Sequence, residues 1–166
     1  MNTDLDETDL KILEAVERDY ERSLEELSAE LDISKSTIHY RMKKLKENGV
    51  ITKPSVTIDP HALGMDMTVL TEVSVTHEQG YADEIGSQLV DIDGIVDVYY
   101  TMGDIDFLVR SRVQDRDQMN QLIDEIIAID GVNETSSRFV MQEVQTNTEL
   151  MSMLSDEMRE NILQAE

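Results

Sequence analysis

Two similar tetrads in the second half of the chain constrain its fold most strongly. They are Ile92-Asp93-Gly94-Ile95 and Ile129-Asp130-Gly131-Val132, and they stand 37 residues apart. Each follows a stretch with helical spacing of apolar residues and precedes a stretch with strand-like alternation. The pattern predicts strands at 67–75, 95–102, 106–113 and 132–144, with helices at 81–90 and 114–128. This half is therefore built from two related units.

The expected order, β-α-β-β-α-β, is that of a ferredoxin-like sandwich, in which two helices cover one face of an antiparallel sheet. The uncovered face is not clearly polar, because both alternating sets contain apolar members. In one predicted strand, Val98 and Tyr100 fall on one face and Tyr99 falls on the other. In the next strand, Phe107 and Leu108 fall on opposite faces. Two apolar faces predict that a second copy covers the open one.

The first third of the chain predicts three short helices, each with a capping residue at its start. Asp6 and Ser23 have an acidic residue three positions later, which is the spacing of a capping box, and Ser34 begins the third helix. That helix ends at Asn48-Gly49. A helix, a short helix, a tight turn and a basic helix form the helix-turn-helix order. Residues 54–58 then predict a short strand or wing.

The third helix divides into a core face and a solvent face on a helical wheel. Ile38, Met42 and Leu45 share the core face. Near the core edge lies Arg41, for which packing or an intra-domain ion pair is at least as good an interpretation as DNA contact. The other face suits a major groove, where N-terminal residues read bases and lysines bind phosphates. We expect base or sugar contacts from Ser36, Thr37, His39 and Tyr40, and backbone contacts from Lys35, Lys43 and Lys44.

Charge is distributed very unevenly. The chain has 36 acidic and 14 basic residues, a formal net charge of -22, but residues 33–53 contain six basic residues against Glu47 alone. A basic stripe on an acidic body is a candidate anion site. The overall acidity is what we expect of a protein from an extreme halophile. At about 1 M salt the Debye length is only about 3 Å, so net charge does not exclude DNA binding.

Other classes of function find little support. The 166-residue chain lacks cysteine, which excludes disulfides, thiol catalysis and cysteine-ligated metals. The three histidines have no metal-ligand spacing, and the phosphate-loop, dinucleotide and nucleophile-elbow motifs are absent. We therefore expect no enzyme activity, no metal and no cofactor. There is no signal peptide or membrane-spanning run, so we expect a soluble, cytoplasmic protein.

The chain resembles the Lrp/AsnC family of transcription regulators from about residue 4 to about 146. The N-terminal resemblance lies in Leu5-Asp6 through Ile12-Leu13, the Leu27 to Leu31 stretch, 33–38, 41–45, Asn48-Gly49-Val50-Ile51, Ile58-Asp59-Pro60 and Leu63-Gly64. The C-terminal half is similar to the family's amino-acid-binding RAM domain through Gly94-Ile95-Val96, 103–107 and Gly131-Val132. The resemblance implies an α+β protein that binds double-stranded DNA as a homodimer, often assembled into octamers, with an amino-acid effector bound where dimers meet.

By the same resemblance, the effector site would involve Gly103, Asp104 and Asp106 with Thr135 and Ser137. A carboxylate would bind an α-ammonium group, and hydroxyls or backbone N–H groups would bind a carboxylate. Gly-Asp between two strands is equally explained as a hairpin turn. The family commonly has Thr where this chain has Ser137, and often an aromatic where it has Ile105.

These observations divide the chain into four parts. They are a (winged) helix-turn-helix domain at 1–53, a linker or hinge strand at 54–66, a ferredoxin-like effector and oligomerisation domain at 67–146, and a helical tail at 147–166. Leu150, Leu154 and Met158 predict a terminal helix that packs on the partner subunit. The favoured function is a sequence-specific regulator. An architectural protein that coats DNA, and a small-molecule sensor with little DNA binding, remain alternatives.

Overall fold

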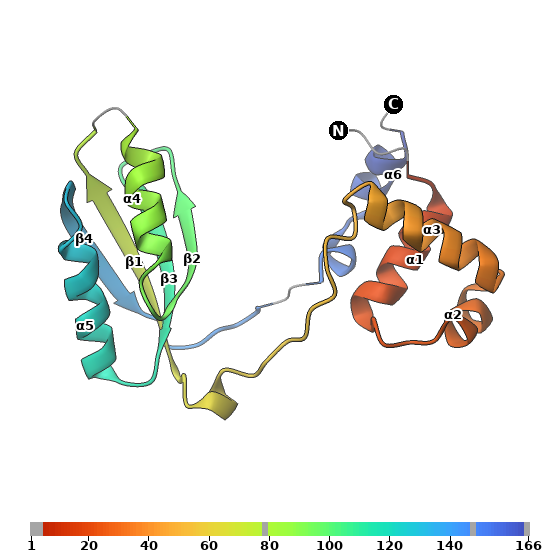
Figure 1. Ribbon diagram of the computed structural model, residues 1–166, viewed down its shortest axis with the longest axis horizontal. Helices are drawn as coiled ribbons and strands as arrows, with labels where there is room; N and C mark the ends of the chain where they lie inside the picture. Colours follow the sequence, from red (N-terminus) through yellow and green to blue (C-terminus); the bar gives the residue numbers. More distant parts are fainter. Residues whose placement is uncertain (1–4, 78–79, 147–148, 165–166) are drawn as a thin grey trace. The chain divides into compact units, whose positions relative to one another are not determined.

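The computed structural model describes residues 5–77, 80–146 and 149–164, which belong to two compact units (Figure 1). The first unit combines Met1–Val56 with Gln145–Glu166, and the second is Thr57–Val144. In the described part of the chain, no helix is both long enough and apolar enough to span a bilayer.

The first unit contains the three expected helices, α1 (Glu7–Arg18), α2 (Leu24–Leu31) and α3 (Lys35–Glu47). All three predicted caps are confirmed. The Asp6 carboxylate accepts from the Asp9 N–H at 2.9 Å, and the hydroxyls of Ser23 and Ser34 accept from N–H groups three residues later. These bonds satisfy N–H groups that have no partner inside the helix. A core then fixes the helices to each other, with the following buried side chains: Ile12, Ala15, Val16, Leu27, Ile38 and Leu45.

The tail returns to this first unit as a 3-10 turn, η2 (Met151–Met153), and a helix, α6 (Asp156–Leu163). The single helix expected through Leu150, Leu154 and Met158 was wrong. The Ser155 side chain caps α6, so the helix begins after Leu154, whose backbone is extended. Met151 is buried instead, and the tail lies against α1 of its own chain.

The second unit is the predicted sandwich. Its elements are the turn η1 (His61–Leu63), then β1 (Met67–Val75), α4 (Tyr81–Val90), β2 (Ile95–Tyr100), β3 (Phe107–Val113), α5 (Arg116–Ile127) and β4 (Val132–Phe139). The antiparallel sheet has the order β2-β3-β1-β4, with α4 and α5 on one face (Figure 1). Alternate residues of β1 and β3 pack with Ile85, Leu89, Leu122 and Ile126 of the helices.

The glycines of the two tetrads allow each helix to turn directly into the next strand. Gly94 and Gly131 have φ of +88° and +93°, a region that side chains with a Cβ rarely adopt. A Cβ at Gly94 would lie 3.1 Å from the Arg112 carbonyl oxygen, and one at Gly131 would lie 3.2 Å from Ile85. Both turns therefore require glycine for their conformation, and at Gly94 the nearby backbone oxygen also leaves little room for a side chain.

The open face of the sheet is more polar than expected. A register shift between Ile95 and Asp97 in β2 turns Ile95, Val98 and Tyr100 all toward the helix-covered face, opposite Ser111, Val109 and Phe107. This bulge explains why both alternating sets of that strand contain apolar residues. The open face carries Leu70, Leu108 and Tyr99 among three ion pairs, Arg110–Asp97, Arg112–Glu143 and Arg138–Glu72.

The expected strand at 54–58 is absent from the structure, where residues 52–59 have no regular secondary structure. Within the described residues this segment pairs with no strand of the sheet. An extended segment without a partner leaves its backbone groups to solvent, so alternation alone does not make a strand. Val56 and Ile58 are correspondingly exposed.

Candidate DNA interface and effector site

Two sets of contacts determine which face of α3 is turned to solvent. Ile38 is fully buried and Leu45 is 2% exposed, so the opposite side of the helix must face solvent. Arg41 binds α1 through its guanidinium, at 2.5 Å from Asp6 Oδ2 and 3.0 Å from Asp9 Oδ1. These carboxylates raise the pKa of Arg41 above its ordinary value. Arg41 therefore joins helices within the unit, as its position near the core edge suggested.

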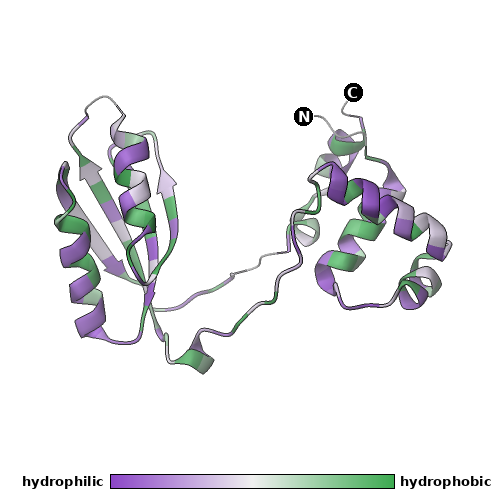
Figure 2. Cartoon of the chain, viewed as in Figure 1, coloured by the Kyte–Doolittle hydropathy of each residue, from purple (hydrophilic) through white to green (hydrophobic). Residues whose placement is uncertain are grey.

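The solvent face of α3 presents a continuous polar surface, and hydrophilic colours dominate this helix in Figure 2. Tyr40 has 68% of its surface exposed and His39 is exposed beside it. Ser36 is exposed and Thr37 is half-buried. Their hydroxyls lie 3.0 Å and 2.7 Å from the Ser34 hydroxyl. The helix start is thus held by a hydroxyl cluster whose oxygens can also bind DNA.

Exposed lysines of α3 differ in their ion-pair partners. Lys35 Nζ lies 2.5 Å from Glu25 and Lys43 Nζ lies 3.7 Å from Glu47. For Lys44, no carboxylate of the described residues is within ion-pair distance. Among the three lysines predicted to bind phosphates, Lys44 is therefore the one that can do so without first breaking an ion pair with a carboxylate of the described residues.

The predicted effector loop joins β2 to β3, and Asp106 closes it. The Thr101 N–H donates to the Asp106 carbonyl oxygen at 2.8 Å, as the hairpin interpretation predicted. The Asp106 carboxylate accepts from the Val75 N–H at 2.8 Å and lies 2.6 Å from His77 Nε2. Its side chain is only 13% exposed. Asp106 therefore holds the end of β1, while Gly103 and Asp104 are exposed at the tip of the loop.

The structure brings only part of the predicted effector set together. Thr135 of β4 is paired with Val73, whose carbonyl oxygen accepts from the Asp106 N–H at 3.0 Å, so Thr135 and the loop flank the same residue of β1. Ser137 lies two residues further along the strand. Its hydroxyl is 2.9 Å from the Thr71 hydroxyl. Thr135 therefore pairs with the β1 residue that the loop contacts, whereas Ser137 pairs with Thr71, two residues away from it.

The sequence did not predict that three aromatic side chains lie beside this loop. His77 stacks on Tyr81 with ring centroids 4.8 Å apart, and the Tyr81 hydroxyl lies 2.7 Å from the Tyr100 hydroxyl. The bond to Tyr100 raises the pKa of Tyr81 to about 12. His77 follows β1 and Tyr81 begins α4, so their proximity to Asp106 depends on the tertiary fold. The only sequence signal was an aromatic and a histidine flanking one strand-to-helix turn.

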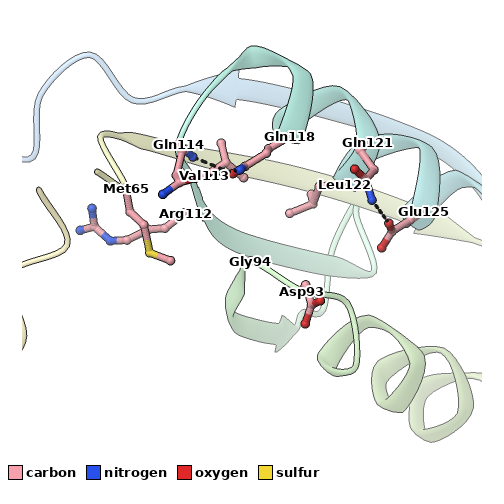
Figure 3. A pocket seen from close by; sticks show the side chains of 10 residues that line it. All are labelled: Met65, Asp93, Gly94, Arg112, Val113, Gln114, Gln118, Gln121, Leu122 and Glu125. Atoms are coloured by element: carbon pink, nitrogen blue, oxygen red, sulfur yellow. Dashed lines mark hydrogen bonds between the residues drawn. The ribbon is translucent and has the colours of Figure 1, made fainter. Parts of the chain in front are cut away.

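A separate cavity of about 350 Å³ lies at the start of α5 (Figure 3). Gly94, Val113 and Leu122 line its apolar part, and none of the predicted effector residues lines it. Its amides are already paired, because Gln118 donates to Gln114 at 3.0 Å and Gln121 donates to Glu125 at 2.9 Å. This cavity is therefore distinct from the loop site.

Comparison with known proteins assigns a family to both halves. Residues 5–52 match the model of a winged helix-turn-helix DNA-binding domain, and residues 68–150 match that of the Lrp/AsnC ligand binding domain. A relative, the HTH-type transcriptional regulator FL11 of Pyrococcus horikoshii, is 38% identical over 150 residues, which cover 90% of this chain and 98% of that protein.

Solved structures share the arrangement of these elements. The structure of AsnC from E. coli matches with a TM-score of 0.80 and 26% identity, covering 87% of this chain and 97% of that one. A transcriptional regulator from Neisseria meningitidis, solved as an L-Met complex, matches with a TM-score of 0.83 and 22% identity, covering 88% and 96%. With the helix-turn-helix and its exposed α3, these matches show that the chain belongs to the Lrp/AsnC family of DNA-binding transcription regulators.

Proposed function

We propose that α3 enters the DNA major groove and reads the operator with its N-terminal half. The observation that carries this proposal is the rotation of α3, in which buried Ile38 and Leu45 turn Tyr40 and the lysines outward. Side chains near the start of a recognition helix reach base edges, whereas lysines bind phosphates. We assign base or sugar contacts to Ser36, Thr37, His39 and Tyr40, and phosphate contacts to Lys35, Lys43 and Lys44.

Selection of a binding sequence from a pool of random duplexes tests this assignment. Wild-type protein should enrich a defined sequence motif. Tyr40→Ala should enrich the same motif with a weaker base preference at the position that Tyr40 contacts. Lys46→Ala is the matched control, since its ammonium group lies 5.5 Å from the centre of the Tyr20 ring and not on the proposed reading face. Failure of the wild-type protein to enrich any motif would favour an architectural role and contradict the proposal.

We infer that the ligand of the second unit is a free amino acid bound at the loop 103–106. Support comes from the ligand-binding family model and from the L-Met complex of the Neisseria regulator. Because Asp106 already binds Val75 and His77, the exposed carboxylate of Asp104 is the group left to bind an α-ammonium. Thr135 and the loop N–H groups would bind the carboxylate, with Ser137 further along β4.

Calorimetric titration of the full chain with each of the proteinogenic amino acids tests this site. We expect at least one to bind, and Asp104→Asn to weaken that binding more than Asp93→Asn does. Asp93 is also exposed, but it lies at the other turn of the sandwich, beside the cavity at α5. Equal binding by both variants would place the ligand elsewhere.

We further propose that the chain acts as a homodimer, with octamers formed at higher concentration, in the cytoplasm of a cell with concentrated salt. Two helix-turn-helix units on two half-sites raise affinity through effective concentration. The net charge of -22 supports work in high salt, where distant carboxylates are screened from DNA. Sedimentation analysis in molar KCl would contradict the dimer if it found only monomer.

A further inference from the structure

The outer face of α1 does not belong to the helix-turn-helix core. Leu10, Glu14 and Glu17 stand at i, i+4 and i+7 and therefore share one face of this helix. Leu10 is 5% exposed, yet it lies outside the apolar cluster formed by Ile12, Ile38 and their neighbours. A buried leucine outside that cluster indicates a second contact on this side of α1.

The turn η2 of the tail lies against α1, and Glu17 is its main polar anchor. One Glu17 carboxylate oxygen accepts from the Leu150 N–H at 2.8 Å and the other accepts from the Met151 N–H at 2.7 Å. These two N–H groups begin the turn η2, so Glu17 caps it from another part of the chain. Met151 is only 7% exposed. Two charge-assisted bonds and a buried methionine thus fix one point of the tail.

Arg159 of α6 fixes a second point. Its Nη1 lies 3.3 Å from Glu14 Oε2, and its Nη2 donates to the Met151 carbonyl oxygen at 3.0 Å. One guanidinium therefore joins α6 to both α1 and η2. The contacts involve none of the residues that we assign to DNA, so docking of the tail leaves the reading face of α3 open.

The segment that leads from β4 into the tail is also fixed at its start. Glu143 binds both Thr68 of β1, at 2.5 Å, and Arg112 of β3, at 2.8 and 2.7 Å. The chain after the sheet is thus attached to the second unit at Glu143 and to the first unit at Met151. The match to the ligand-binding domain ends at residue 150, so all but the first two residues of the docked tail, 149–164, lie beyond it.

We propose that the outer face of α1 is a docking surface for the chain's own tail, residues 149–164, and that the docked tail forms a second connection between the two units. With the 57–66 segment alone, the DNA-binding unit would be held at one point. Two connections restrict its rotation, and so restrict the spacing of half-sites that a dimer can occupy. This last step rests on the proposed dimeric DNA binding.

Chemical cross-linking tests the docking without DNA. The chain has no cysteine, so a Glu14→Cys/Arg159→Cys variant carries only the two introduced thiols. This variant gives up the contacts of Arg159 but keeps both hydrogen bonds to Glu17, so its cross-link reports docking through Glu17. A short bismaleimide should give a product that migrates as a single chain. Adding Glu17→Gln should lower its yield about tenfold, because the charge on the acceptor of two hydrogen bonds is lost. Adding Glu21→Gln, an exposed acid beyond the end of α1, should not change it. Cross-linking between chains would place the tail on another copy and overturn the proposal.

Binding to operators with altered half-site spacing tests whether the docked tail restricts the spacing that a dimer can occupy. The sequence selected by the wild-type protein is compared with versions whose half-sites are moved apart by about 5 base pairs, half a helical turn. Wild type and Glu21→Gln should lose at least about tenfold in affinity, and Glu17→Gln should lose about threefold or less. An unchanged spacing preference in Glu17→Gln, with cross-linking reduced, would refute the second connection. Equal binding of wild type to every spacing would instead contradict the dimeric function.

Discussion

Replacement of Lys44 with glutamine is the change to which the structure assigns the largest electrostatic effect on DNA binding. Lys44 is exposed on α3, and none of the carboxylates described in the structure pairs with it, whereas Lys35 and Lys43 must release Glu25 and Glu47. A phosphate contact contributes about 0.9 to the slope of log affinity against log salt. A dimer that loses the contact twice should lose about 1.8 from this slope. Relative to 1 M salt, that corresponds to roughly 60-fold in affinity at 0.1 M.

The assay is fluorescence anisotropy of labelled duplex DNA at several KCl concentrations. Lys44→Gln should lower the slope on the preferred sequence and on a scrambled duplex alike, because phosphates carry no sequence information. Lys46→Gln removes the same charge from the same helix and should change the slope much less. Equal slopes for Lys44→Gln and wild type would refute the assignment of Lys44 to a phosphate. A loss confined to the preferred sequence would instead assign it to a base.

Three further changes test other parts of the account. Tyr40→Ala should weaken binding by about 1–3 kcal/mol on the preferred sequence and little on scrambled DNA, and equal losses on both would refute its base-reading role. Gly94→Ala should lower the free energy of unfolding in urea by about 1–3 kcal/mol, because φ there is +88°. The Thr68 hydroxyl and then Arg112 lower the pKa of Glu143 from its ordinary 4.5. Its stabilising effect is therefore present above pH about 4.5 and lost as pH falls through the lowered pKa. Glu143→Gln should destabilise the protein near neutral pH, and a stability difference that does not shrink in acid would contradict this pairing.

Much of the fold could be predicted from local patterns. The caps at Asp6, Ser23 and Ser34 depend on bonds three residues long, and all three are present. The alternation of β1 matches its burial, since one face of this strand packs on the helices. The outward orientation of Tyr40 followed from helical periodicity. These features depend on residues that are only a few positions apart in the sequence.

The remaining features depend on contacts between distant residues. The bulge in β2 depends on its register with β3, which alternation alone does not specify. The Asp106 carboxylate is bound by Val75 and His77 from the end of another strand, so its spacing in the loop could not show that it was already occupied. The tail was expected as one helix on a partner subunit. Its burial depends on Glu17, more than a hundred residues earlier.

The most direct test of the central claim is the affinity of the purified chain for the DNA upstream of its own coding sequence and for a scrambled duplex. Anisotropy is measured from low to molar KCl, with and without a pool of amino acids. We predict a clear preference for the native fragment that weakens as salt rises, with an affinity that changes when the pool is added. Equal binding to both duplexes, or no binding at any salt, would contradict a sequence-reading role for α3.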